Sequence, residues 1–262
     1  MKTSSKQKKN QKTTRRGLDR AQRLRILAVL SLLLFMGLIF LIYANTFHSP
    51  FILDDVSRIQ ENPLIRVKDF SILQIIKAGF DSSKTRPLAF ISFAANYSLH
   101  QYDVFGYHLF NLLIHILTGF FVYLFLKATF RIPIIQARYK NADLISFFAA
   151  LIWLVHPIQT QAVTYIVQRM TAMAALFFVL SFLFYAYGRL AENNRRKYFW
   201  LSASVAAWLL SLGFKQITAV LPFLVFLYEW YFFQDLSKQW FKKSLKYLLG
   251  ISAIFILLFL IF

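Results

Sequence analysis

Residues 105–126 read FGYHLFNLLIHILTGFFVYLFL and contain no Asp, Glu, Lys or Arg. A helix rises about 1.5 Å per residue, so this stretch is long enough to cross the roughly 30 Å hydrocarbon core of a bilayer. A shorter apolar run lies at residues 144–156, and further long runs lie at residues 26–43, 170–188, 198–214, 217–233 and 247–262. The pattern predicts an all-α polytopic membrane protein with about seven transmembrane helices; six or eight are also compatible with it.

The composition supports the same fold class. Apolar residues make up 58% of the 262 residues, and charged residues only 16%. A soluble domain would carry roughly 25% charged and 45–50% apolar residues, so a water-soluble, disordered or collagen-like chain is excluded. The sequence contains no cysteine, which excludes disulfides and thiolate metal sites.

The net charge of +19 is concentrated in alternating connections between the apolar runs. Residues 1–25, 127–143, 189–197 and 229–246 together carry +17, whereas the other connections carry +2. Short connections rich in Lys and Arg stay in the cytoplasm. The pattern therefore predicts a cytoplasmic N-terminus, and because topology explains the charge, no nucleic-acid partner is expected.

Two regions follow from this pattern. Residues 1–25 form a basic cytoplasmic tail that would touch anionic headgroups, and residues 26–262 form the transmembrane module. Residues 26–43 are longer than the apolar part of a typical signal peptide, which favours an uncleaved anchor. The last apolar run is still open at Phe262, so we expect a partial sequence of a longer protein. The location is an integral multi-pass membrane protein, in the plasma or inner membrane if the source is bacterial.

The long connection at residues 44–104 is predicted to be exoplasmic. Apolar residues recur in it near helical spacing, at Phe70, Ile72, Leu73, Ile75, Ile76 and Phe80. Pro87 then opens a second helical run at residues 88–99, a position at which proline is favourable. Both segments are expected to be interfacial helices that lie along the membrane surface.

Asp54 and Asp55 follow the first apolar run directly. Two adjacent carboxylates at a membrane surface could act as a general base or hold a divalent cation. The alternative is a turn or a helix N-cap, since Asp is favoured at both.

Further polar residues gather at the predicted outer ends of the spans. His108 and Asn111 share one helix face with His115, where they could bind a substrate or hydrogen-bond to a neighbouring helix. A histidine and three cations lie in the outer connections: Arg86, His156, Arg169 and Lys215. Such cations would suit a phosphate, or could contact lipid headgroups by snorkelling.

Several stretches, taken in order, resemble the membrane part of the transmembrane and tetratricopeptide-repeat O-mannosyltransferase-like proteins, including their bacterial relatives. That family belongs to the GT-C class of polytopic glycosyltransferases. The resemblance covers about residues 44–230 and rests on residues 50–55, 86–88, 96–97, 106–115, 156–169 and 215–216. The chain departs from the family pattern at Gln159, Gln161 and Gln216, where acidic residues or histidine are more common.

The resemblance implies transfer of a sugar from a polyprenyl-phosphate donor to an acceptor hydroxyl on a protein or glycan, on the exoplasmic side. Asp54, ahead of Asp55, would take the proton, and the same pair would hold a divalent cation if one is used. Substrate-binding residues would be Arg86, His108, Asn111, His156, Arg169 and Lys215. The alternative is a non-enzymatic membrane protein, either a carrier of a lipid-linked solute or an inactive fragment of a larger transferase.

Overall fold

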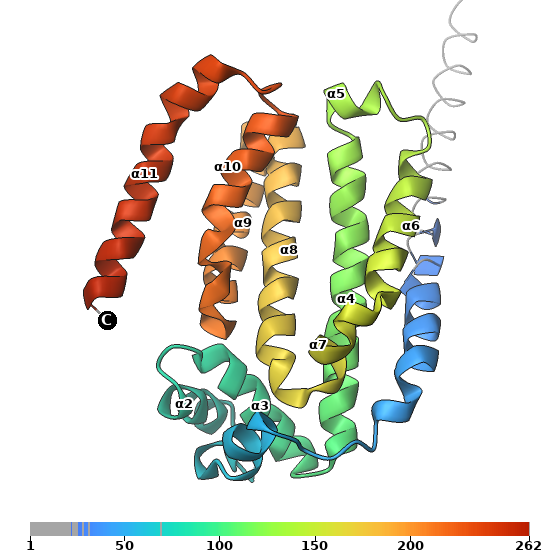
Figure 1. Ribbon diagram of the computed structural model, residues 1–262, viewed down its shortest axis with the longest axis vertical. Coiled ribbons are helices and arrows are strands. Elements are labelled where there is room, and N and C mark those ends of the chain that lie inside the picture. Colours follow the sequence, from blue (N-terminus) through green and yellow to red (C-terminus); the bar gives the residue numbers. More distant parts are fainter. Residues whose placement is uncertain (1–21, 23–25, 28, 31, 69, 262) are drawn as a thin grey trace, which may run out of the picture.

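The structure, a computed structural model, describes residues 22, 26, 27, 29, 30, 32–68 and 70–261. Its described part is helical and contains no β-strand, which confirms the all-α prediction (Figure 1). The predicted tail, residues 1–25, lies almost wholly outside the described residues, as do parts of the first apolar run. The longer helices are Leu32–Thr46, α2 (Ile72–Ser82), α3 (Pro87–His100), α4 (Val104–Phe130), α6 (Ala142–Val155), α8 (Arg169–Leu190), α9 (Asn194–Phe214), α10 (Leu221–Phe232) and α11 (Lys238–Ile261).

The helices form a bundle with a small helical cap at one end (Figure 1). In the bundle, α8 packs between α4 and α9, and α6 packs on α4. The cap, residues 50–103, contains α2 and α3, which pack on each other, and the short helices η2 (Val56–Gln60) and η3 (Pro63–Ile65). At the opposite end of the bundle, α8 and α10 are connected through Arg189, whose guanidinium donates two hydrogen bonds of 2.8 Å to Glu229.

Two helices of the described chain are long and apolar enough to cross a membrane, Val104–Phe130 and Ile166–Leu190. The pair Ala142–Val155 and Pro157–Thr164, bent by 51°, would be a third span if it crosses as one. The structure thus supports a membrane protein with two or three spans. It does not show the predicted seven: Leu32–Thr46 and Gln216–Phe232 are apolar but shorter than a span.

The bend has a local cause at His156 and Pro157. A residue before proline is pushed out of the helical region, and His156 is extended, with φ −66° and ψ 131°. Its Nδ1 then accepts a hydrogen bond from the Ile158 N–H at 3.2 Å, which caps the short helix Pro157–Gln159. The short apolar run at residues 144–156 therefore continues into Pro157–Thr164 after a bend, as a broken span or a re-entrant loop.

The two cap helices differ from each other. On α2, the apolar side chains of Ile72, Leu73, Ile76 and Phe80 are exposed, as expected of an interfacial helix. On α3, by contrast, most apolar side chains are buried in the main core cluster. A Cβ at Gly79 of α2 would collide with Ile91 and the Pro87 carbonyl oxygen, so glycine permits the close approach of the helices. Most of α3 is therefore covered by the protein, and its position along the membrane surface stays a prediction.

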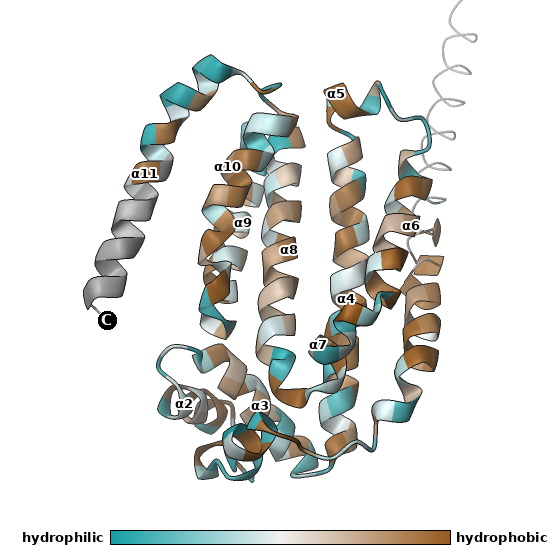
Figure 2. Ribbon diagram, in the orientation of Figure 1, coloured by the Kyte–Doolittle hydropathy of each residue, from teal (hydrophilic) through white to brown (hydrophobic). Residues whose placement is uncertain are grey.

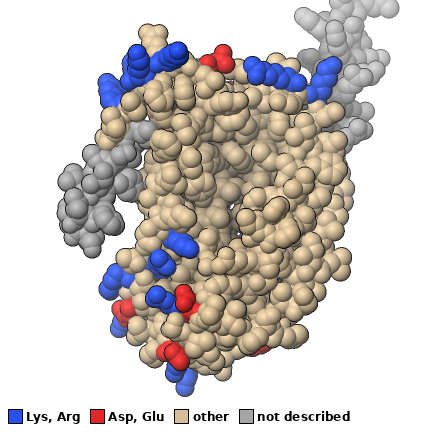
Figure 3. All heavy atoms as spheres, in the orientation of Figure 1, with Lys and Arg blue, Asp and Glu red and all other residues tan. Residues whose placement is uncertain are grey.

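Charge and hydropathy divide the molecule along its length. Hydrophobic residues predominate along α4 and α6, and hydrophilic ones gather toward the two ends (Figure 2). Lys and Arg side chains line the bundle end far from the cap, whereas the cap carries both signs (Figure 3). This is the distribution on which the predicted orientation rests.

Candidate functional site

The candidate site is organised by one segment, residues 165–171, which we call the α8 start. It comprises Tyr165, the short helix η5 (Ile166–Gln168) and the first turn of α8. Its groups contact the cap, α4 and the turn between α9 and α10.

The two adjacent carboxylates lie in different environments. The Asp55 side chain is 1% exposed and accepts hydrogen bonds from the backbone N–H groups of Val167, at 2.6 Å, and Ile52, at 3.2 Å. The Asp54 side chain is exposed, while its backbone N–H donates to the Tyr165 hydroxyl at 2.9 Å. Asp55 thus ties the cap to the α8 start and leaves Asp54 facing outward.

Burial raises the pKa of the Asp55 carboxyl above its ordinary value of 3.8, although the backbone N–H groups that it accepts from oppose this shift. Immediately before the pair, Leu53 adopts φ 48°, a left-handed conformation that is uncommon for leucine. Such strained positions persist only where the surroundings hold them, and they cluster at functional sites.

Arg169, the first residue of α8, is completely buried. Its guanidinium donates to the side-chain oxygens of Asn111, at 2.8 Å, and Asn96, at 2.7 Å. It also donates to the carbonyl oxygens of Ser92 and Tyr107, at 3.3 and 3.1 Å. Arg169 therefore joins α3, α4 and α8, and its geometry is that of a residue that holds the site together.

Arg86 and Lys215 meet on the other side of the α8 start. The Lys215 ammonium donates to the Thr171 hydroxyl at 2.7 Å, and the Arg86 guanidinium contacts the Met170 sulfur at 3.9 Å. Gln216 links the two segments by accepting from Arg86 at 3.2 Å. Burial lowers the pKa of Lys215, and the nearby Arg86 charge lowers it further.

Neither Arg86 nor Lys215 forms an ion pair in the part of the chain that the structure describes. The ion pairs in that part are Lys127 with Asp143 and Arg189 with Glu229. Two adjacent cations without a carboxylate partner form a positively charged position that suits a phosphate.

The remaining predicted residues are placed apart from these two groups. His108 is 2% exposed and its Nε2 donates to the Ser49 carbonyl at 3.0 Å, which fixes the chain before the Asp pair. Its Nδ1 is buried and has no hydrogen-bond partner among the described residues. Asn111 is fully buried and donates to the Ile166 carbonyl, while His115 donates to the Leu154 carbonyl. His156 is exposed, in the bend after α6.

The structure thus brings together Asp54 with Asp55, and Arg86 with Lys215, around the α8 start. Sequence reasoning missed Tyr165 and Thr171, which contact these groups. An ordinary tyrosine and threonine near a span carry no signal for such a role, because their partners are distant in the sequence.

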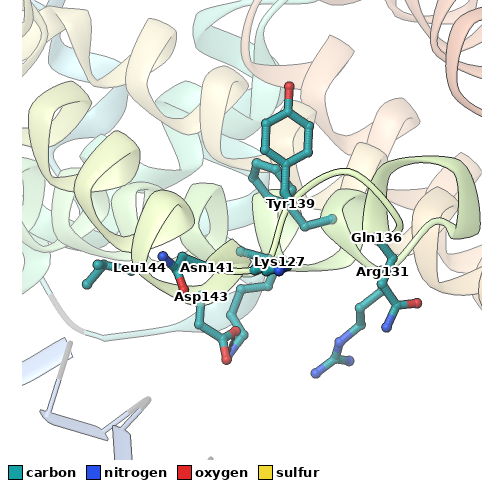
Figure 4. Close-up of a pocket in the computed structure, with 10 residues that line it drawn as sticks. Lys127, Arg131, Gln136, Tyr139, Asn141, Asp143 and Leu144 are labelled. Atoms are coloured by element: carbon teal, nitrogen blue, oxygen red, sulfur yellow. Dashed lines mark ion pairs between the residues drawn. The ribbon is translucent and has the colours of Figure 1, made fainter.

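Metal and cavity geometry add two observations. Among the described residues, no three His, Cys, Asp or Glu side chains are grouped so that they could hold a metal ion. One cavity, of about 420 Å³, lies at the bundle end far from the cap and includes none of the candidate residues (Figure 4).

Comparisons with known proteins were made for the whole chain. No family model and no solved structure matches it. Curated relatives include "Protein O-mannosyl-transferase Tmtc3" of Drosophila melanogaster, 33% identical over 167 residues, which are 55% of this chain and 18% of that protein. "Protein O-mannosyl-transferase TMTC3" of Homo sapiens is 29% identical over 174 residues, 62% of this chain and 17% of that protein. "Protein O-mannosyl-transferase tmtc2" of Xenopus laevis is 33% identical over 191 residues, 69% and 21%. The chain therefore spans about a fifth of the length of these relatives.

Proposed function

Because the chain is a distant homologue of protein O-mannosyl-transferases over about 60% of its length, we propose that it transfers a sugar from a polyprenyl-phosphate donor to an acceptor hydroxyl of a protein or glycan. The observation that carries the proposal is the contact of one segment, the α8 start, with a carboxylate pair on one side and two unpaired cations on the other. A sugar attached to a phosphate needs both, a base for the acceptor and positive charge for the leaving group.

In the proposed arrangement the cap faces the exoplasm and the basic bundle end faces the cytoplasm. The chain then has a GT-C-like topology, with about seven spans when the bent pair, the two shorter apolar helices, α9 and α11 are counted with the two long helices. The alternating charge of the connections supports this orientation.

Asp54 is the proposed base. The acceptor oxygen forms a bond to the anomeric carbon, and its proton passes to the Asp54 carboxylate. The bond between the sugar and the phosphate oxygen breaks, and its electron pair stays on that oxygen, so polyprenyl phosphate leaves. Asp55 acts as a positioning residue, because its buried hydrogen bonds hold the turn on which Asp54 is presented.

Arg86 and Lys215 are the proposed ligands of the phosphate. Positive charge that is fixed before the reaction stabilises the negative charge that develops on the leaving group. Arg169 and Asn111 are assigned to positioning, since they join α3, α4 and α8, and His108 to fixing the chain at Ser49. His156, which is exposed, remains a proposed contact to the donor or headgroup. A divalent cation at Asp54 and Asp55 would be an addition to these residues.

The test is a transfer assay with the purified chain in liposomes, a polyprenyl-phosphate-linked mannose and a peptide rich in Ser and Thr. Asp54→Asn should lower transfer on the order of 10²-fold or more, the range of general-base catalysis. The matched control is Asp81→Asn, a substitution of another exposed cap carboxylate, on α2.

Equal transfer by Asp54→Asn and wild type would refute the catalytic assignment. Wild type that binds the donor without transferring its sugar would favour the inactive module. Movement of the intact donor across the bilayer would favour the carrier.

A further inference from the structure

A second polar site lies at the bundle end far from the cap, in the cavity of about 420 Å³ between the end of α4 and the start of α6 (Figure 4). Three cations line it, Lys127, Arg131 and Lys140, together with Asp143. No role in the proposed transfer involves this cavity, which shares no residue with the site around the α8 start. It therefore needs an account of its own.

The charges of the cavity are only partly balanced. The Lys127 side chain is 10% exposed and pairs with Asp143 at 2.9 Å; both residues are labelled in Figure 4. Arg131 and Lys140 are exposed, and neither forms an ion pair in the described part of the chain. One carboxylate thus faces three cations, and the cavity keeps a net positive charge.

The walls are held in place by packing. Ile132, next to Arg131, is 1% exposed, and the rings of Phe130 and Tyr139 pack at 5.5 Å across the connection from α4 to α6. The Gln136 N–H also donates to the Ile132 carbonyl at 2.8 Å. These contacts fix the backbone that carries Arg131 and Lys140, so less of the chain has to be ordered when a ligand binds.

An apolar path leads from the cavity along α6. Leu144 lines the cavity, and Leu144, Phe148 and Ile152 follow at intervals of four residues. Residues spaced in this way share one helix face, and these three are 56%, 50% and 63% exposed. A polar, positive cavity thus continues into an exposed apolar stripe, as a molecule with a charged head and a hydrocarbon chain requires.

We propose that this cavity binds the phosphate headgroup of an anionic membrane phospholipid, with its acyl chain along the stripe on α6. Arg131 offers planar, paired donors to phosphate oxygens, and Lys140 adds a point charge. The volume exceeds that of a single phosphate ion and leaves room for the glycerol or its substituent. The apolar stripe favours a lipid over a soluble phosphate.

Native mass spectrometry of the full chain in detergent would measure the binding of dioleoyl phosphatidylglycerol and of dioleoyl phosphatidylcholine. We expect wild type to prefer the anionic lipid, and Arg131→Gln with Lys140→Gln to reduce this preference on the order of tenfold. The matched control is Arg195→Gln with Arg196→Gln, which removes two exposed cations from the same bundle end but outside the cavity.

Equal losses in the two double variants would overturn the proposal, because they would show general attraction to a basic surface. Displacement of phosphatidylglycerol by inorganic phosphate at similar concentration would assign the cavity to a soluble ligand instead. Melting temperatures of all variants show whether a loss comes from unfolding. Because the assay measures binding alone, it is independent of the proposed transfer activity.

Discussion

Two neighbouring residues, Asp54 and Asp55, have opposite surroundings although the sequence presents them as a pair. Asp55 is buried by contacts with residues more than 100 positions away, and Asp54 stays exposed. The local sequence cannot reveal which of the two side chains is buried, because the burial of Asp55 depends on where Val167 lies in the folded chain. Placing Asp54 ahead of Asp55 came from the family resemblance, and the catalytic role of either residue stays a prediction.

The buried carboxyl of Asp55 should leave a pH signature on stability. Its pKa is raised in the folded state, so the folded protein holds this proton more tightly than the unfolded chain does. Its contribution to the free energy of unfolding is then largest below about pH 3.8 and declines as the pH rises through the raised pKa. We expect the melting temperature of Asp55→Asn in detergent to vary less with pH across this interval than that of wild type.

The control for this measurement is Asp81→Asn, which should retain the wild-type pH profile because Asp81 is exposed. If the melting temperature of Asp55→Asn followed the same pH dependence as that of wild type, burial would not change the pKa of Asp55.

Cations at the site were predictable as a group but not in their partners. Arg86, Arg169 and Lys215 all stood out as basic residues at span ends, yet the structure separates them. Arg169 is surrounded by hydrogen-bonding oxygens, while Arg86 and Lys215 lie near each other and form no ion pair with a carboxylate in the part of the chain that the structure describes. Sequence spacing carries no information on this division, since it is decided by the packing of α3 against α8.

Among the elements, the apolar runs predicted the long helices well because a chain in lipid must satisfy its backbone groups internally. The cap helices show the limit of that reasoning. Both α2 and α3 contain many apolar residues, but α2 is amphipathic and α3 is apolar on most sides: α3 fills the core, whereas α2 has three faces. Its faces are buried (Ile75, Ala78 and Gly79), apolar and exposed (Ile72, Leu73, Ile76 and Phe80), and polar and exposed (Gln74, Lys77 and Asp81).

The exposed apolar face of α2 should enter the bilayer surface. The chain contains no cysteine, so Phe80→Cys and Asp81→Cys each provide a single site for an environment-sensitive fluorophore. In liposomes the label at position 80 should show blue-shifted emission, as expected of a group in an apolar medium, and the label at position 81 should not.

Similar emission from both sites would contradict an interfacial position of α2. Spectra of the same labelled variants in detergent-free buffer with denaturant supply the water-exposed reference.

At the scale of the whole molecule, the basic bundle end and the mixed-charge cap predict a fixed orientation in the membrane. Single cysteines at Lys84→Cys, in the cap, and Glu192→Cys, between α8 and α9, are both exposed positions. A membrane-impermeant maleimide added to intact cells should label position 84 and spare position 192 until the membrane is opened.

Labelling of both positions from the same side would contradict the proposed topology. It would also contradict the two proposals together, because they place the cations Arg86 and Lys215 and the headgroup cavity in opposite leaflets.

The enclosure of Arg169 sets an order for assembly during synthesis. All four groups that it donates to, on Ser92, Asn96, Tyr107 and Asn111, precede it in the chain. The carboxylate side of the site can therefore close as soon as the α8 start leaves the ribosome, whereas Arg86 must wait for Gln216 and Lys215. A nascent chain arrested shortly after α8 would carry the proposed base and Arg86 but lack Lys215, so the proposed phosphate-binding pair would be complete only after α9 has entered the membrane.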